Sequence, residues 1–183
     1  TQNSEKFLKG KTVLITAGPT REYIDPVRYI TNGSSGKMGI ALAEEAVRMG
    51  GKVILVTGIE NSELRIENMK NCKIIKIKTT EEMFEAVKEN INKADIFISA
   101  AAVCDFKPEK VSKNKMKKTV GTRPALSLRL METVDILKWV GKFKLKMKNE
   151  KLKIIGFALE TENLTENAKK KLKEKNLDLI IAN

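Results

Sequence analysis

The sequence contains no histidine and only two cysteines among its 183 residues. Without imidazole side chains, zinc sites and acid–base chemistry that depend on histidine are excluded. The two thiols, Cys72 and Cys104, lack the spacing of a metal site and provide no disulfide framework. We therefore expect a protein of a reducing compartment, the cytoplasm.

Long apolar runs are also absent. No stretch approaches the roughly 20 consecutive apolar residues that a membrane-spanning helix needs. Residues 1–10 contain no apolar core of a secretory signal, and they are interpreted as a linker or leader before a single domain that spans residues 11–183. The sequence predicts no membrane partner.

Aromatic residues make up only 5% of the chain, whereas lysine and arginine give a net charge of +12. The positive field favours an anionic partner, which is a nucleotide, a phosphorylated metabolite or a nucleic acid. A second interpretation is that many lysines form a charged surface without a partner. Nucleic-acid modules stack bases on aromatic side chains, and the lysine run 113–118 contains none, so we expect no nucleic acid. A basic nucleic-acid-binding module stays an alternative.

Apolar runs predict six β-strands, at 12–16, 52–57, 73–78, 95–100, 153–158 and 177–182. Most are continuous runs of valine, isoleucine and leucine, which is typical of strands buried on both faces of a parallel sheet. Helical spacing of apolar residues predicts helices between them, at 35–49, 81–92, 133–140 and 163–175. This alternation predicts an α/β fold with a Rossmann-like, doubly wound, mostly parallel sheet. Ligands of such sheets bind beyond the carboxyl ends of the strands.

Two predicted loops are longer than ordinary connections, at 18–34 and 103–125. The first ends in glycines spaced three residues apart: Gly33, Gly36 and Gly39. Free amides at the predicted helix start, together with Ser34 and Ser35, are suited to holding an anion. The pattern is not a Walker loop, because Lys37 is followed by Met38.

The first loop also departs from a dinucleotide fingerprint, because about 15 residues separate the first strand from the glycines. A nicotinamide-dependent oxidoreductase would further need an acidic residue at the end of the second strand. That strand ends in Val56-Thr57-Gly58. Both departures argue against an NAD(P)-dependent oxidoreductase, which stays the second alternative.

Small residues followed by an aspartate lie at the start of the second loop, in the segment Ser99 to Asp105. They permit the close approach of a flat ring or a phosphate, and Asp105 is a candidate cation ligand. Lysines of the same loop and of the last predicted helix, among them Lys115, Lys171 and Lys175, are candidate phosphate contacts or solvated side chains.

Five segments together resemble the phosphopantothenoylcysteine synthetase family, also called phosphopantothenate–cysteine ligases. They are GKTVLITAGPTREYIDPVRYITNGSSGKMG, SAAAVCDFKPEK, NKMKKT, IGFALET and KNLDLIIAN. The resemblance implies a Rossmann-like fold, a homodimer and, in many members, fusion to a flavin-dependent decarboxylase that supports higher oligomers. It also implies that the chain stops before the family's usual C-terminus.

The resemblance implies a CTP-dependent ligation. The carboxylate of 4′-phosphopantothenate would attack the α-phosphate of CTP, giving an acyl-cytidylate and pyrophosphate. The amine of L-cysteine would then displace CMP. Such chemistry needs reactant positioning and neutralised phosphates, supplied by lysines and Mg²⁺ rather than by histidine.

The resemblance also implies roles for individual residues. Catalysis would rest on three side chains: Arg28, Asn32 and Lys115. Contacts to the nucleotide and to the pantothenoyl group would come from Ala101, Ala102, Asp105, Lys115, Thr133, Val134, Asp135, Ile136, Phe157, Lys171 and Lys175. Asp105 would also bind the metal. Thr133-Val134 stands where the family usually has Asn-Pro, so this chain departs from the family pattern there.

Overall fold

The computed structural model of the chain describes residues 6–59, 70–117, 128–158 and 162–182. Its centre is a six-stranded sheet in the order β10-β9-β6-β1-β4-β5, in which every pair of neighbours is parallel. The strands are β1 (Thr12–Pro19), β4 (Lys52–Thr57), β5 (Cys72–Lys76), β6 (Ile96–Ala102), β9 (Lys153–Ala158) and β10 (Leu179–Ala182). All six strands had been predicted, with shifts of a few residues at their ends, and the predicted α/β class is confirmed.

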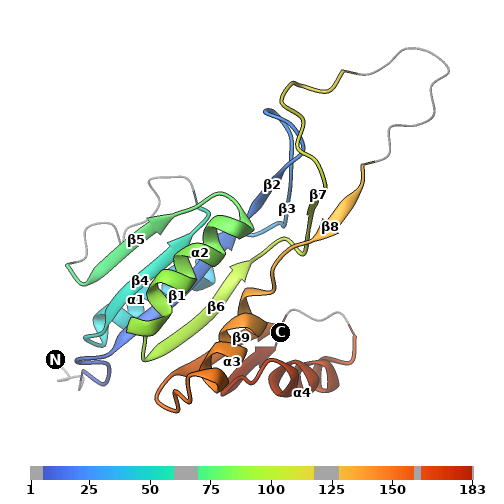
Figure 1. The fold of residues 1–183 in the computed structure, drawn as a ribbon. Coiled ribbons are helices and arrows are strands. Elements are labelled where there is room, and N and C mark those ends of the chain that lie inside the picture. Colours follow the sequence, from blue (N-terminus) through green and yellow to red (C-terminus); the bar gives the residue numbers. More distant parts are fainter. Residues whose placement is uncertain (1–5, 60–69, 118–127, 159–161, 183) are drawn as a thin grey trace.

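The chain reverses its direction of winding beside β1. It runs outward from β1 to β4 and β5, then returns to β6 on the other side of β1 and continues to β9 and β10. The carboxyl ends of β1 and β6 therefore flank the switch point, where open parallel sheets bind ligands. Figure 1 shows the helices distributed over both faces of the sheet.

The helices are α1 (Lys37–Arg48), α2 (Thr80–Asn90), α3 (Ile136–Lys146) and α4 (Leu164–Glu174), and a 3-10 turn, η2 (Ile91–Lys93), follows α2. A capping box opens α2, since the Thr79 hydroxyl accepts from the Glu82 amide and the Glu82 carboxylate accepts from the Thr79 amide. Helix α1 ends as predicted at the glycine pair, where Gly50 has a φ of 85°.

Helix α3 corrects two sequence-based expectations. It had been predicted at 133–140, but it begins only after Asp135, whose carboxylate accepts from the Lys138 amide and thus caps the helix. It also continues to Lys146, six residues beyond the predicted end at residue 140. Its apolar face, with Ile136 and Val140, is buried against the sheet.

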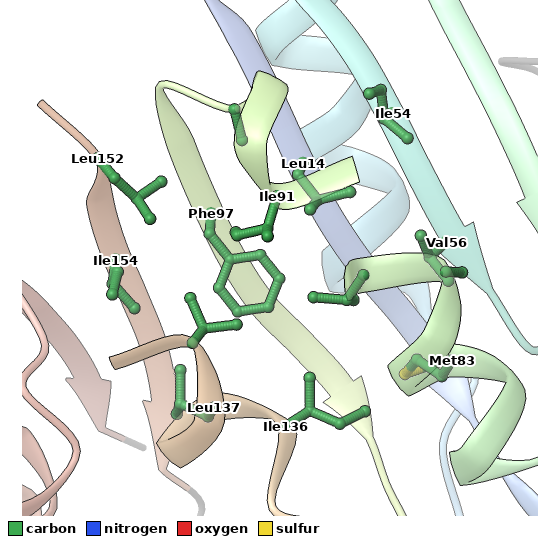
Figure 2. Packing of buried hydrophobic residues seen from close by; sticks show 14 of the residues in the cluster. Leu14, Ile54, Val56, Met83, Ile91, Phe97, Ile136, Leu137, Leu152 and Ile154 are labelled. Carbon is green, nitrogen blue, oxygen red and sulfur yellow. The ribbon is translucent and has the colours of Figure 1, made fainter. Parts of the chain in front are cut away.

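Two apolar layers enclose the sheet. On one face, Leu14 and Phe97 pack against Met83 of α2 and Leu137 of α3 (Figure 2). On the other face, side chains of β1 and β4 pack against Ala43 and Ala46 of α1. Helix α1 lies so close that a Cβ on Gly39 would stand 2.4 Å from the Ala17 Cβ. Here the glycine serves close packing between helix and strand.

Residues 6–10, expected to be a linker, partly belong to this packing. The Leu8 amide donates to the Met49 carbonyl at the end of α1, and the Leu8 side chain contacts the α1-side layer. These contacts of Leu8 lie before the boundary at residue 11, which stays a prediction.

Short antiparallel strands that the sequence had not indicated lie within the two long loops or, for one of them, just after the second loop. β2 (Arg21–Tyr23) pairs with β3 (Tyr29–Thr31), and β7 (Phe106–Pro108) pairs with β8 (Leu130–Glu132). These hairpin-like elements extend away from the main sheet (Figure 1). We call residues 21–31, 106–117 and 128–132 the arm.

Candidate functional site

A pocket of about 850 Å³ opens at the switch point of the sheet. Its floor is the end of β6, from Ser99 to Ala102, and its walls come from the segment after β3, the start of α3, the end of β9 and the face of α4. This volume is typical of sites for small molecules and cofactors. Eleven of the predicted site positions line it: Asn32, Ala101, Ala102, Asp105, Thr133, Val134, Asp135, Ile136, Phe157, Lys171 and Lys175.

Asn32 is held over the end of β6 by its side-chain amide. Its Nδ2 donates to the Val103 carbonyl at 2.8 Å and to the Ala102 carbonyl at 3.4 Å. Because both partners are carbonyls, the nitrogen of the amide must be the atom that faces them. The remaining Oδ1 has no hydrogen-bond partner among the described residues, so it is free to accept from a ligand.

Asp105 follows a residue that is fixed from several sides. The amide of the buried Cys104 donates to the Thr20 hydroxyl at 2.9 Å, and its carbonyl accepts from the Thr133 hydroxyl at 2.6 Å. The Thr133 amide in turn donates to the Asp105 carbonyl at 2.9 Å. These contacts fix the backbone, while the exposed Asp105 carboxylate has no partner in the described part of the chain.

The chemistry of Asp105 suits a hard cation only together with a ligand. Within the described ranges, no three histidine, cysteine or acidic side chains gather as a metal site. Mg²⁺ is commonly held by one or two carboxylates together with substrate phosphates. The Asp105 carboxylate at the pocket therefore fits a magnesium ion that arrives with a phosphate-bearing substrate.

Two lysines of different electrostatic state face the pocket from the end of α4. Lys175 is paired, since its Nζ lies 2.7 Å from Asp135 Oδ2. Partial burial alone would raise the pKa of the Asp135 carboxyl, but hydrogen bonds from Lys175 and from the Lys138 amide hold that pKa below 3.8. Lys171 is half-buried and has no ion-pair partner among the described residues.

The other predicted contacts supply shape. Ala101 and Ala102 leave room above the end of β6, and the ring of Phe157 contributes an apolar surface from β9. Gly156 precedes Phe157, and a Cβ at Gly156 would stand 2.9 Å from Leu177 and 3.0 Å from Leu137. Because Gly156 has no side chain, β9 packs closely against Leu137 and Leu177 beside the pocket.

Arg28 and Lys115 do not line this pocket. Both lie on the arm, where Arg28 forms an ion pair with Asp25 and donates to the Met116 carbonyl. Lys115 directly precedes Met116 and is exposed. Within one chain, the structure therefore separates these two predicted catalytic residues from the others.

Several pocket residues were missing from the predicted set, among them Ser99, Val103 and Glu132. Ser99 lies near the carboxyl end of β6 and Val103 directly follows this strand, and this position is the signal that applies to them. Glu132 lies in β8 and reaches the pocket only because β8 pairs with β7. The predicted anion site at Ser34 and Ser35 is not part of the pocket lining and stays a prediction.

Both cysteines are free, Cys104 buried and Cys72 half-buried. In the described ranges, no helix is long and apolar enough to cross a membrane.

Comparison with known proteins identifies relatives of this chain. The chain is 45% identical over 182 residues to the coenzyme A biosynthesis bifunctional protein CoaBC of Borreliella burgdorferi, covering 99% of this chain and 44% of that protein. It is 48% identical over 177 residues to the protein of the same name from Bacillus subtilis, covering 96% of this chain and 41% of that protein. The chain thus spans less than half the length of these relatives.

A solved structure agrees with this comparison. The C-terminal domain of a coenzyme A biosynthesis bifunctional protein CoaBC has a TM-score of 0.79 and 42% identity, covering 98% of this chain and 80% of that one. Residues 8–183 also match the family model described as the DNA/pantothenate metabolism flavoprotein C-terminal domain. The chain therefore belongs to the family of DNA/pantothenate metabolism flavoprotein C-terminal domains.

Proposed function

We propose that this chain catalyses the ligation of 4′-phosphopantothenate to L-cysteine in coenzyme A biosynthesis, with CTP as the activating nucleotide. The products are 4′-phosphopantothenoylcysteine, CMP and pyrophosphate. The observation that supports this function most directly is the pocket itself. It brings Asn32, Asp105 and Lys171 from three distant parts of the sequence to one end of the sheet.

In the first step, a carboxylate oxygen of phosphopantothenate attacks the α-phosphorus of CTP, and the bond to pyrophosphate breaks. The acyl-cytidylate that forms has a good leaving group, which a free carboxylate lacks. The transition state concentrates negative charge on phosphate oxygens, so fixed cations lower its energy. Lys171 would supply such charge from α4, next to the ion-paired Lys175, and the ring of Phe157 would contact the nucleotide from β9.

A magnesium ion fits at Asp105, where it would neutralise phosphate charge alongside the lysines. The backbone that presents this carboxylate is fixed through Cys104 and Thr133. The segment that leads into α3 borders the pocket and would contact the nucleotide through Thr133, Val134, Asp135 and Ile136.

In the second step, the amine of cysteine attacks the acyl carbon, the bond to the cytidylate oxygen breaks, and the amine loses one proton. Asn32 is suited to orient the intermediate because its Nδ2 is anchored on two carbonyls and its Oδ1 remains available. Ala101 and Ala102 leave space beside it for the pantothenoyl group. This step needs orientation more than charge.

If two copies of the chain form a homodimer through their arms, Arg28 and Lys115 of one copy would reach the pocket of the other. The arm exposes Val27, Tyr29, Val111, Leu130 and Met131, each between 41% and 59% accessible. Two-stranded hairpins are marginal on their own, and a second copy that covers these side chains would stabilise them. Fusion to a flavin-dependent decarboxylase, consistent with the word bifunctional in the relatives' names, would build larger assemblies.

The alternatives from the sequence have less support. A nicotinamide-dependent enzyme would need an acidic residue after β4, but Thr57 and Gly58 stand there. A nucleic-acid module would need aromatic platforms near the lysines, and the pocket contributes only Phe106 and Phe157. A cytoplasmic location stays a prediction.

One assay tests the function and the choice of nucleotide. The protein is incubated with phosphopantothenate, L-cysteine, Mg²⁺ and either CTP or ATP, and nucleoside monophosphate, pyrophosphate and phosphopantothenoylcysteine are quantified. We expect CMP and pyrophosphate in equal amounts with the amide product, and much less product with ATP. Amide formation with ATP at least as fast as with CTP would refute the CTP assignment. If neither nucleotide yields pyrophosphate, the proposed ligase function is refuted.

A further inference from the structure

Asp25 is a carboxylate with no accessible surface, in the turn between β2 and β3. Its Oδ1 accepts from the amides of Val27 and Arg28, at 2.8 and 2.9 Å. Its Oδ2 accepts from the Arg28 guanidinium, with Nε at 2.9 Å, and from the Met116 amide at 3.2 Å. A buried charge is tolerated only when it is paired and hydrogen-bonded, and here both oxygens are fully used.

The two oxygens of this carboxylate have different tasks. Oδ1 closes the local turn, which an aspartate or an asparagine performs equally well in many proteins. Oδ2 joins segments that are 91 residues apart in sequence, because it binds the turn on one side and Met116 on the other. A turn alone would not need the second oxygen, so this contact points to a role outside the turn.

The segment that Asp25 holds is the one that contains Lys115. The Ser112 amide donates to the Ile24 carbonyl at 2.9 Å, and Arg28 Nη2 donates to the Met116 carbonyl at 2.9 Å. Lys115 thus lies between two attachment points, three residues after the first and one before the second. Its backbone is fixed although its side chain is exposed.

We propose that Asp25 is a positioning residue of the ligase reaction, which acts by fixing the Arg28 guanidinium and the backbone of Lys115 in one rigid unit of the arm. The proposal rests on the function proposed above for Arg28 and Lys115. Without the second acceptor oxygen of Asp25 the turn would still form, but the Lys115 segment would lose the attachment at Met116. The ammonium group of Lys115 would then sample many positions, and ordering it would cost conformational entropy in each catalytic cycle.

The test separates the two oxygens by the substitution Asp25→Asn. The amide oxygen can replace Oδ1 in the turn, whereas the amide nitrogen cannot accept from Arg28 and Met116. Asp95→Asn is the matched control, because Asp95 likewise binds a backbone amide and a basic side chain, those of Thr12 and Lys11, and it lines none of the pocket. Arg28→Lys is the second variant should Asp25→Asn fail to fold, since it keeps a cation beside Asp25.

Two readouts are compared at a temperature at which circular dichroism shows all variants folded. The first is the rate at which trypsin cuts the bond between Lys115 and Met116, identified by mass spectrometry. The second is the rate of pyrophosphate release for Asp25→Asn, for Lys115→Gln and for the double variant. Proteolysis of a folded protein follows local opening, and losing a hydrogen bond to a charged group changes such an equilibrium by about tenfold or more.

We expect Asp25→Asn to be cut after Lys115 about tenfold faster than wild type, and Asp95→Asn to be cut at the wild-type rate. We also expect the double variant to release pyrophosphate no more slowly than Lys115→Gln, because both changes remove the same contribution. If Asp25→Asn, or Arg28→Lys in its place, is cut after Lys115 at the wild-type rate, Asp25 and Arg28 do not hold the Lys115 segment through Met116, and the proposal is overturned. If the double variant releases pyrophosphate more slowly by the product of the two single effects, Asp25 does not act through Lys115, and that part of the proposal is overturned. Unchanged pyrophosphate release by Lys115→Gln alone would instead refute the role of Lys115 in the proposed function, and faster cutting would still establish the attachment.

Discussion

Lys175 and Asp135 form an ion pair at the rim of the pocket, with 2.7 Å between Nζ and Oδ2. The same carboxylate begins α3, because its Oδ1 accepts from the Lys138 amide at 2.9 Å. One side chain thus links the end of α4 to the start of α3 beside the pocket where we propose that the nucleotide binds.

The two tasks of Asp135 can be separated by substitution. Asparagine still caps a helix, so Asp135→Asn should lose only a half-exposed ion pair, which is typically a small contribution to stability. Asp135→Ala should lower the free energy of unfolding by about 1 kcal/mol more, because the cap is lost as well. Urea denaturation measures both variants. Equal stability of the two would show that the cap contributes nothing.

Lys171 should contribute to nucleotide binding, whereas its neighbour Lys169 should not. Lys171 lines the pocket, and Lys169 lies on another side of the same helix. We expect Lys171→Gln to raise the KM for the nucleotide about tenfold through the loss of a charge-assisted hydrogen bond. Lys169→Gln removes the same charge from the protein and is the control. A similar KM for both variants would mean that only net charge matters.

Asn32→Asp should damage the second step more than the first. The substitution turns a donor that faces the Val103 carbonyl, at 2.8 Å, into an acceptor, so the side chain must leave its position. We expect pyrophosphate release to continue and the yield of amide product per pyrophosphate to fall severalfold. Rapid-quench analysis with labelled phosphopantothenate measures both quantities. An unchanged ratio of amide to pyrophosphate would contradict the placement of Asn32.

Asp178 should make stability depend on pH. Its Oδ2 accepts from Lys144 at 2.6 Å and from the Ile154 amide at 2.8 Å. Burial alone would raise the pKa of Asp178, but these hydrogen bonds and the charge of Lys153 lower it below 3.8. Because the folded-state pKa is the lower one, the stabilisation is present above pH 3.8 and is lost as the pH falls through the folded-state value.

The corresponding variant is Asp178→Asn, which cannot titrate. At pH 7 we expect it to be about 1–2 kcal/mol less stable than wild type, because Lys144 loses its charged partner. This difference should shrink as the pH falls below 3.8. Urea denaturation across pH measures it, and a constant difference would exclude Asp178 as the titrating group.

Substituting valine for two buried threonines of the sheet should change the stability of the protein in opposite directions. Thr16 is 1% exposed and its hydroxyl has no hydrogen-bond partner in the described part of the chain, whereas the Thr57 hydroxyl accepts from the Ile59 amide at 3.2 Å. Thr16→Val should stabilise the protein by about 1 kcal/mol, and Thr57→Val should destabilise it by a similar amount. Thermal unfolding compares them, and destabilisation by Thr16→Val would reveal a partner for that hydroxyl.

Sequence patterns were most informative where the physical cause is local. The continuous apolar runs of β1 and β4 indicate burial on both faces, and the Thr79–Glu82 capping box marks the start of α2. The start of α3 was misplaced because capping by Asp135 overrides the helical spacing that includes Thr133 and Val134.

The arm shows the limit of such patterns. β7 and β8 have three residues each, and the partner of Phe106 is Glu132, far along the chain. No periodicity develops over three residues, and the pairing depends on closing a long loop. The attachment of Met116 to the buried Asp25 is non-local for the same reason.

The sequence by itself determined the parallel α/β sheet and, through five matching segments, the family, because strand burial and contiguous motifs are written in neighbouring residues. Only the tertiary structure decided which candidates meet. It gathers Asn32, Asp105 and Lys171 at one pocket and holds Arg28 and Lys115 on the arm. The physical reason is that strand order at the switch point and the pairing of distant strands are set by packing over the whole chain.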